Sequence, residues 1–192
     1  MIVLVLGLVI FLGVHSVRIV ADDWRGATLS RVGEGTWKGV YSLLSAVGLV
    51  LLIWGYGLTR TAPVELWSPP VWTRHAAALL TLVAFVLLAA AYVPGTRIKA
   101  AVGHPMVVGT KVWAFAHLLA NGRLADVVLF GAFLAWAVAL YAASRRRDRR
   151  LGVRYVAGPA SRDAIAVAVG VAAWVAFAFW LHAWLFGVRP FG

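Results

Sequence analysis

Six runs of predominantly apolar residues divide the chain into elements of membrane-spanning length. They cover residues 2–20, 40–58, 76–93, 106–120, 124–143 and 164–188, with polar or turn-forming residues between them. About 20 apolar residues in helical conformation cross the ~30 Å hydrocarbon core of a bilayer. In lipid, a helix satisfies its own backbone polar groups. The pattern therefore predicts an all-α, polytopic membrane bundle of six transmembrane helices, forming a single domain over residues 1–192.

Two of these runs need separate interpretation. The first has the length of a signal peptide, but no basic residue precedes it and no cleavage signal closes it, because His15 and Arg18 follow. We therefore expect a retained helix. The fourth run is short, and Asn121-Gly122 is a turn signal between it and the fifth. These two runs predict a tight helical hairpin.

Composition supports the membrane class and limits the chemistry. Hydrophobic residues make up 62% of the 192 residues and charged residues 13%, whereas roughly a quarter of the residues in a soluble domain are charged. The chain contains no cysteine. Disulfides, iron–sulfur clusters, thiolate-ligated haem and thiol nucleophiles are thereby excluded. Any metal chemistry must use histidine, methionine, carboxylates or the backbone.

The net charge of +11 is distributed unevenly between the two sides of the predicted bundle. Thirteen of the 18 Lys and Arg residues fall in or beside the loops after the first, third and fifth runs, and four fall on the other side. The positive-inside rule then predicts that both termini face away from the cytoplasm. The basic stretch 145–150 is interpreted as a topology anchor, with a docking site for anionic membrane lipid or a partner as the alternative. No free basic domain is present, so nucleic acid is not an expected partner.

Five histidines lie in or near these apolar runs, where burying an imidazole without a partner costs free energy. A metal or cofactor shared between helices would explain them. His104 precedes Pro105 and should begin the fourth helix near the cytoplasmic surface. His117 follows thirteen residues later, about 20 Å further along the axis. These two histidines cannot bind one iron together, and His117 is the intramembrane one.

The depths of the other histidines leave two ligand pairs open. A rise of ~1.5 Å per residue puts His182 level with His117, and His15 nearer the cytoplasmic side. Helix tilts of ~20° can bring His15 level as well. His75 opens the third run near the outer interface. Zinc is less favoured, because no two histidines have the i, i+4 spacing of a helical zinc site.

Two imidazoles from different helices are suited to b-type haem, while covalent c-type attachment needs a C-x-x-C-H motif that is absent. Arg18 and Lys111 could neutralise the haem propionates or could extend to the membrane surface. Asp126 could pair with Arg123, relay protons with His117 in a transporter, or stabilise a helix start. No internal repeat supports a transporter.

A further pattern lies in the second run, where Ser45, Gly48, Leu52 and Gly55 recur at helical spacing. This stripe predicts close approach of another helix.

Several segments resemble the bacterial NnrU family over essentially the full chain. They are HSVR at 15–18, GEGTWKGVYSLLSAVGLVLLIWGYG at 33–57, TRH at 73–75, PGTRIKA at 94–100, HPMVVGTKVWAFAHLLANG at 104–122, and the terminal LHAWLFGVRPFG. The resemblance implies a protein of the bacterial inner membrane, associated with nitrite and nitric oxide reduction. Membrane nitrogen-oxide reductase components are the implied partners.

The family is similar, more weakly, to the plastid zeta-carotene isomerase, a haem b enzyme that converts a cis double bond to trans. That similarity implies His15 and His117 as the axial ligands. The isomerase has a cysteine three residues before the second histidine, where this chain has Ala114, so ligand exchange with sulfur is excluded. The resemblance therefore favours a haem protein of denitrification. A polyene isomerase and a haem-free accessory or maturation factor for membrane reductases are the alternatives.

Overall fold

The computed structural model describes residues 1–191, and these form an all-α bundle, as predicted. The elements are α1 (Ile2–Val20), α2 (Asp22–Thr59), α3 (Val71–Tyr92), α4 (Arg97–Val102), α5 (Pro105–Ala120), α6 (Leu124–Leu151), α7 (Ala160–Ala176), the π-helical segment η1 (Phe177–Leu181) and α8 (His182–Phe186).

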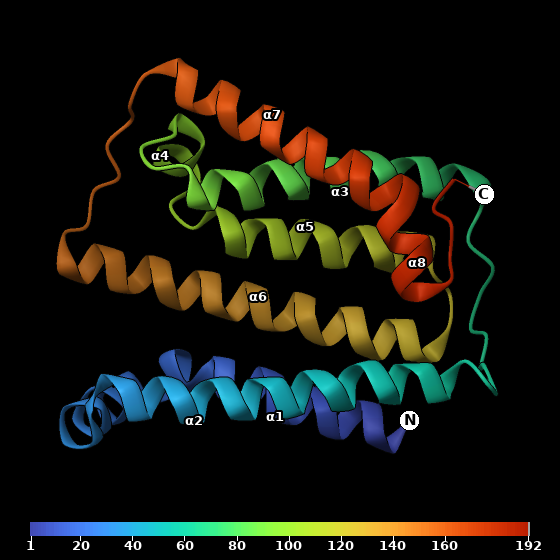
Figure 1. Ribbon diagram of the computed structural model, residues 1–192, viewed down its shortest axis with the longest axis horizontal. Helices are drawn as coiled ribbons and strands as arrows, with labels where there is room; N and C mark the ends of the chain where they lie inside the picture. Colours follow the sequence, from blue (N-terminus) through green and yellow to red (C-terminus); the bar gives the residue numbers. More distant parts are fainter. Residues whose placement is uncertain (192) are drawn as a thin grey trace.

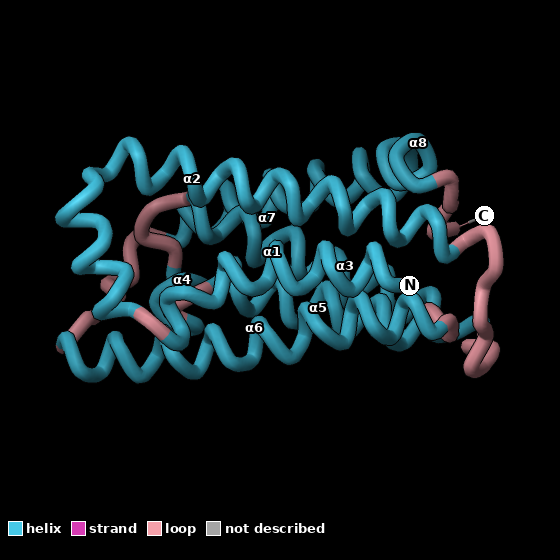
Figure 2. Tube along the Cα trace, turned by 90° about the horizontal axis from the view of Figure 1, so that it is seen from below, coloured by secondary structure: helices cyan, strands magenta, loops and turns pink. Residues whose placement is uncertain are grey.

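The long helices lie roughly along one axis and pack in a fixed order (Figures 1 and 2). Helix α1 packs against α2 and α6, α6 against α5, α5 against α3, and α3 against α7. Both chain termini lie at one end of the bundle, which we call the terminal end (Figure 1). The C-terminal end of α6 and the short helix α4 lie at the other end. We call it the arginine end, after Arg145, Arg146, Arg149 and Arg150.

Five helical stretches are long and apolar enough to cross a membrane: Ile2–Val20, Asp22–Thr59, Val71–Tyr92, Leu124–Leu151 and Ala160–Phe186. No more than 17% of the most apolar window of each is buried inside the protein. Exposed apolar helix faces of this kind need lipid around them. The protein is therefore a multi-pass membrane protein. Helix α5, the remaining predicted span, has 16 residues and a length of about 24 Å.

The segment between the first two apolar runs differs from the prediction. We expected a loop there, but α2 begins at Asp22, directly after the Ala21 that ends α1. The 38-residue helix changes direction at Gly33, where φ is 81° and ψ is 161°. Glycine adopts this positive φ without the penalty that a side chain would bring. The loop prediction was wrong because hydropathy shows that a segment is polar but does not show whether that polar segment is a helix or a loop.

Three other boundaries also extend beyond the apolar runs. Helix α3 begins at Val71 rather than at residue 76, and α6 continues through the arginine-rich stretch to Leu151 rather than ending at 143. The last span begins at Ala160 rather than at 164, passes through η1, and ends at Phe186. Apolar runs mark the lipid-embedded part of a helix, whereas the helix ends are set by caps such as Pro70 and Gly152.

The small-residue stripe of α2 lies against α1, as predicted. A Cβ atom on Gly48 would lie 2.7 Å from the backbone nitrogen of Phe11, and one on Gly55 would collide with the backbone of Leu4. The buried side chains of Leu4, Leu8 and Leu52 surround this contact. Close backbone approach thus fixes α1 on α2, and α1 in turn places His15 beside α6.

Candidate functional site

His15 and His117 lie in the same local arrangement on different helices. Nδ1 of His15 lies 2.7 Å from the carbonyl oxygen of Phe11, and Nδ1 of His117 lies 2.8 Å from that of Trp113. Each carbonyl belongs to an aromatic residue one helical turn earlier. A carbonyl oxygen only accepts, so each Nδ1 carries a proton, and in the neutral form of the ring Nε2 carries the lone pair. Among the hydrogen bonds of residues 1–191, none involves either Nε2.

The two histidines are connected through an aromatic stripe on α6, formed by Phe130, Phe133 and Trp136. The His117 ring stacks on Phe130 with centroids 4.5 Å apart, and the His15 ring meets Trp136 edge-on at 6.1 Å. Between them, the Phe133 ring lies 5.9 Å from Phe11 and 5.5 Å from Trp113. The stripe therefore links both histidine helices.

The structure does not bring the His15 and His117 rings into contact. Helices α1 and α5 run in opposite directions along α6 (Figure 1), so the two rings diverge from Phe133 toward opposite ends of the stripe. Their contacts on α6, Trp136 and Phe130, are six residues apart in sequence, or about 9 Å along the axis. Binding one iron between these two rings would require side chains of the aromatic stripe to move.

His182 offers the same donor atom near the terminal end. Its Nδ1 lies 2.8 Å from the carbonyl oxygen of Val188, and its ring lies against Phe177 and Phe186. The equal heights of His182 and His117 expected from the sequence stay a prediction.

Asp126 is 2% exposed and has two structural partners. The Tyr56 hydroxyl donates to Oδ1 at 2.5 Å, and the backbone N–H of Arg123 donates to Oδ2 at 3.3 Å. The second contact is part of a capping box at the start of α6. A cavity of about 240 Å³ lies beside this pair and is also lined by Arg60 and Arg123. The helix-start interpretation of Asp126 is thus the one that these contacts support.

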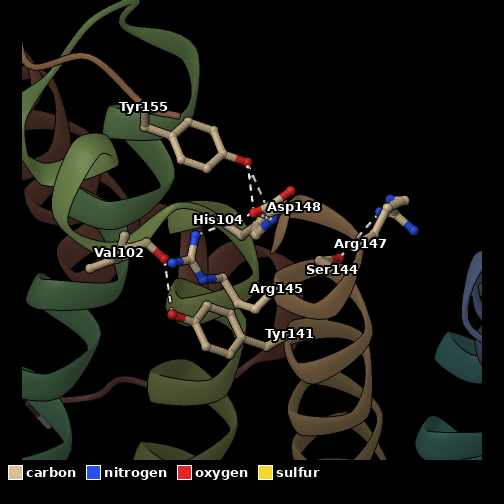
Figure 3. A network of polar contacts seen from close by, with 8 residues as sticks. All are labelled: Val102, His104, Tyr141, Ser144, Arg145, Arg147, Asp148 and Tyr155. Atoms are coloured by element: carbon tan, nitrogen blue, oxygen red, sulfur yellow. Dashed lines mark hydrogen bonds and ion pairs between the residues drawn. The ribbon is translucent and has the colours of Figure 1, made fainter. Parts of the chain in front are cut away.

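His104 is bound differently from the other histidines (Figure 3). Its Nε2 lies 2.8 Å from Oδ2 of Asp148, and the same oxygen accepts from Arg145 and from the Tyr155 hydroxyl, each at 3.2 Å. Burial acts to raise the pKa of Asp148, but the hydrogen bond and charge of His104, with those of Tyr155 and Arg145, bring it below its ordinary value. Burial and the Asp148 carboxylate raise the pKa of Tyr155.

This network was missed in the sequence, because Asp148 lies within a basic run and Tyr155 in a loop. The only available signal was a single carboxylate among five arginines. The network of His104, Asp148, Arg145 and Tyr155 connects the start of α5 to the end of α6.

The remaining candidates have contacts or surroundings of their own. Arg18 forms an exposed ion pair with Asp22 at 3.5 Å. The Lys111 ammonium lies 4.0 Å from the centroid of the Tyr141 ring. His75 is exposed in the first turns of α3. Within residues 1–191, no group of three or more His, Asp or Glu side chains is arranged to hold a metal ion.

The sequence model of the NnrU family, described as NnrU protein, matches residues 3–190. No curated protein and no solved structure matches the chain.

Proposed function

The chain belongs to the NnrU family, and we propose that it binds b-type haem within the bacterial inner membrane and serves nitrite and nitric oxide reduction. The observation that supports haem binding is the hydrogen-bonding pattern of three histidines. His15, His117 and His182 each place Nδ1 on a backbone carbonyl, and none of their Nε2 atoms is hydrogen-bonded among residues 1–191. Neutral imidazole with Nε2 free and Nδ1–H held by an acceptor is the form that ligates haem iron.

His117 would be the common ligand, with His15 or His182 as the second. Either pair could supply two imidazole Nε2 atoms to the haem iron. The aromatic stripe separates His117 from His15, which supports His182 as the second ligand. Phe130 and Trp113 cover the His117 ring and would exclude water from the iron. The haem would supply redox and gas-binding chemistry at this position.

A haem-free accessory role for membrane reductases is the second candidate. It is favoured by the aromatic stripe, whose side chains pack against Phe11 and His15 and fill the space between α1 and α6. In that role the Nδ1–H groups of His15 and His117 would only bond carbonyl oxygens of their own helices.

An absorption spectrum of protein purified after haem-replete expression separates these functions. We expect a Soret band that is lost in His117→Ala and kept in His75→Ala, because His75 is exposed and lies on another helix. A missing Soret band in the unmodified protein would favour the accessory role.

Deletion of the gene tests the physiological part. Slower nitrite and nitric oxide reduction with unchanged carotenoid isomers is expected. A deletion that changes only the carotenoid isomers would instead support the isomerase.

A further inference from the structure

We propose that the end of α6 binds the headgroup of an anionic phospholipid. The site is an open pocket of about 480 Å³ at the arginine end, lined by Tyr141, Ala142, Arg145, Arg146 and Arg149. It lies where the apolar part of α6 gives way to its basic extension. A phosphate placed there would meet several guanidinium donors at once, which is the geometry that phosphate recognition favours.

The positive charge of this pocket is only partly neutralised by acidic side chains of residues 1–191. Arg145 is paired with Asp148. Among the ion pairs of residues 1–191, none involves Arg146 or Arg149, and both side chains are exposed. The ammonium of Lys111, held over the Tyr141 ring at 4.0 Å, adds positive charge from α5. The pocket therefore favours an anion.

The surface beside the pocket indicates a lipid rather than a free anion. Val138, Ala142 and Arg146 follow at four-residue steps and so share one face of α6. Val138 is 52% exposed and Ala142 is exposed as well. An acyl chain can lie along Val138 and Ala142 while the headgroup contacts Arg146 and Arg149. This continuity of apolar and basic surface matches one diacyl phospholipid.

Native mass spectrometry of the purified full-length protein tests the proposal. The protein is titrated with phosphatidylglycerol, and separately with phosphatidylcholine carrying the same acyl chains. We expect preferential retention of phosphatidylglycerol, and about tenfold weaker binding of the first lipid in the double variant Arg146→Gln/Arg149→Gln. The double variant Arg146→Lys/Arg149→Lys should recover part of the binding, because it restores the charge without the forked donors.

The matched control removes two positive charges at positions that do not line the pocket. Arg31 and Arg154 are exposed and take part in none of the ion pairs of the described chain. Arg31→Gln/Arg154→Gln should bind like the unmodified protein. An equal loss in this control, equal retention of phosphatidylcholine, or displacement of the lipid by inorganic phosphate would each overturn the proposal.

Discussion

The Nε2 atom of His104 lies 2.8 Å from Oδ2 of Asp148, on a helix 44 residues further along the chain. His117 belongs to the same sequence segment, yet it uses Nδ1 on its own helix and leaves Nε2 without a hydrogen bond among the described residues. One segment thus carries two histidines in opposite bonding states. This difference predicts different roles for them.

If His117 ligates haem as proposed, His117→Ala should remove the haem or change its spin state, because water cannot replace the lost ligand in the membrane. His104→Ala should leave most of the haem in place, since its Nε2 already bonds Asp148. Haem per protein and the visible spectrum of both purified variants check this. Full occupancy with an unchanged spectrum in His117→Ala, together with haem loss in His104→Ala, would reverse the assignment.

Asp148 should make stability depend on pH. Burial acts to raise the pKa of its carboxyl group, but His104, Tyr155 and Arg145 together lower this pKa below its ordinary value in the folded protein. A lowered pKa contributes stability above the unfolded value of about 4, and this contribution is lost as pH falls through the folded value. The melting temperature in detergent should therefore fall on acidification.

The variant Asp148→Asn should melt lower at pH 7, since unpairing a buried network costs about 1–3 kcal/mol. Its melting temperature should also change less on acidification. Asp23→Asn is the control, because Asp23 is exposed. The same acid response in Asp148→Asn and in the unmodified protein would contradict the prediction.

Gly55→Ala should destabilise the α1–α2 contact. The added methyl group collides with the Leu4 backbone, which cannot rotate away as a side chain can. Overpacking of this kind costs about 1–3 kcal/mol. Gly57→Ala, two residues on, adds a methyl group with no atom within 4 Å and should be neutral or slightly stabilising. Melting temperatures of the two variants give the comparison, and equal values would count against this packing.

The fold was largely predictable because hydropathy in a membrane protein reports directly on lipid contact. The fourth helix starts after His104 and the turn follows at Asn121, as Pro105 and Gly122 indicate. The helical segment before Gly33 could not be recognised, since polar interfacial helices and loops have similar composition.

The candidate site was predictable only as a set of residue types. Spacing predicts equal heights for His117 and His182, but the aromatic stripe depends on how α1 and α5 rotate toward α6, which one sequence does not specify. The His104–Asp148 bond likewise depends on a long-range contact between two helix ends.

The same bond makes a prediction about topology. A distance of 2.8 Å between His104 and Asp148 requires the start of α5 and the end of α6 to lie on one side of the membrane. We therefore predict that α5 also crosses, toward the terminal end and despite its 16 residues, so that the chain makes six crossings with both termini on one side. Reporter fusions after Lys99 and Arg150 should read cytoplasmic, because basic loops are retained there. Fusions after Ala62 and at the C-terminus should read periplasmic. Opposite compartments for the Lys99 and Arg150 fusions would mean that α5 does not cross the membrane. That result would contradict the contact between His104 and Asp148.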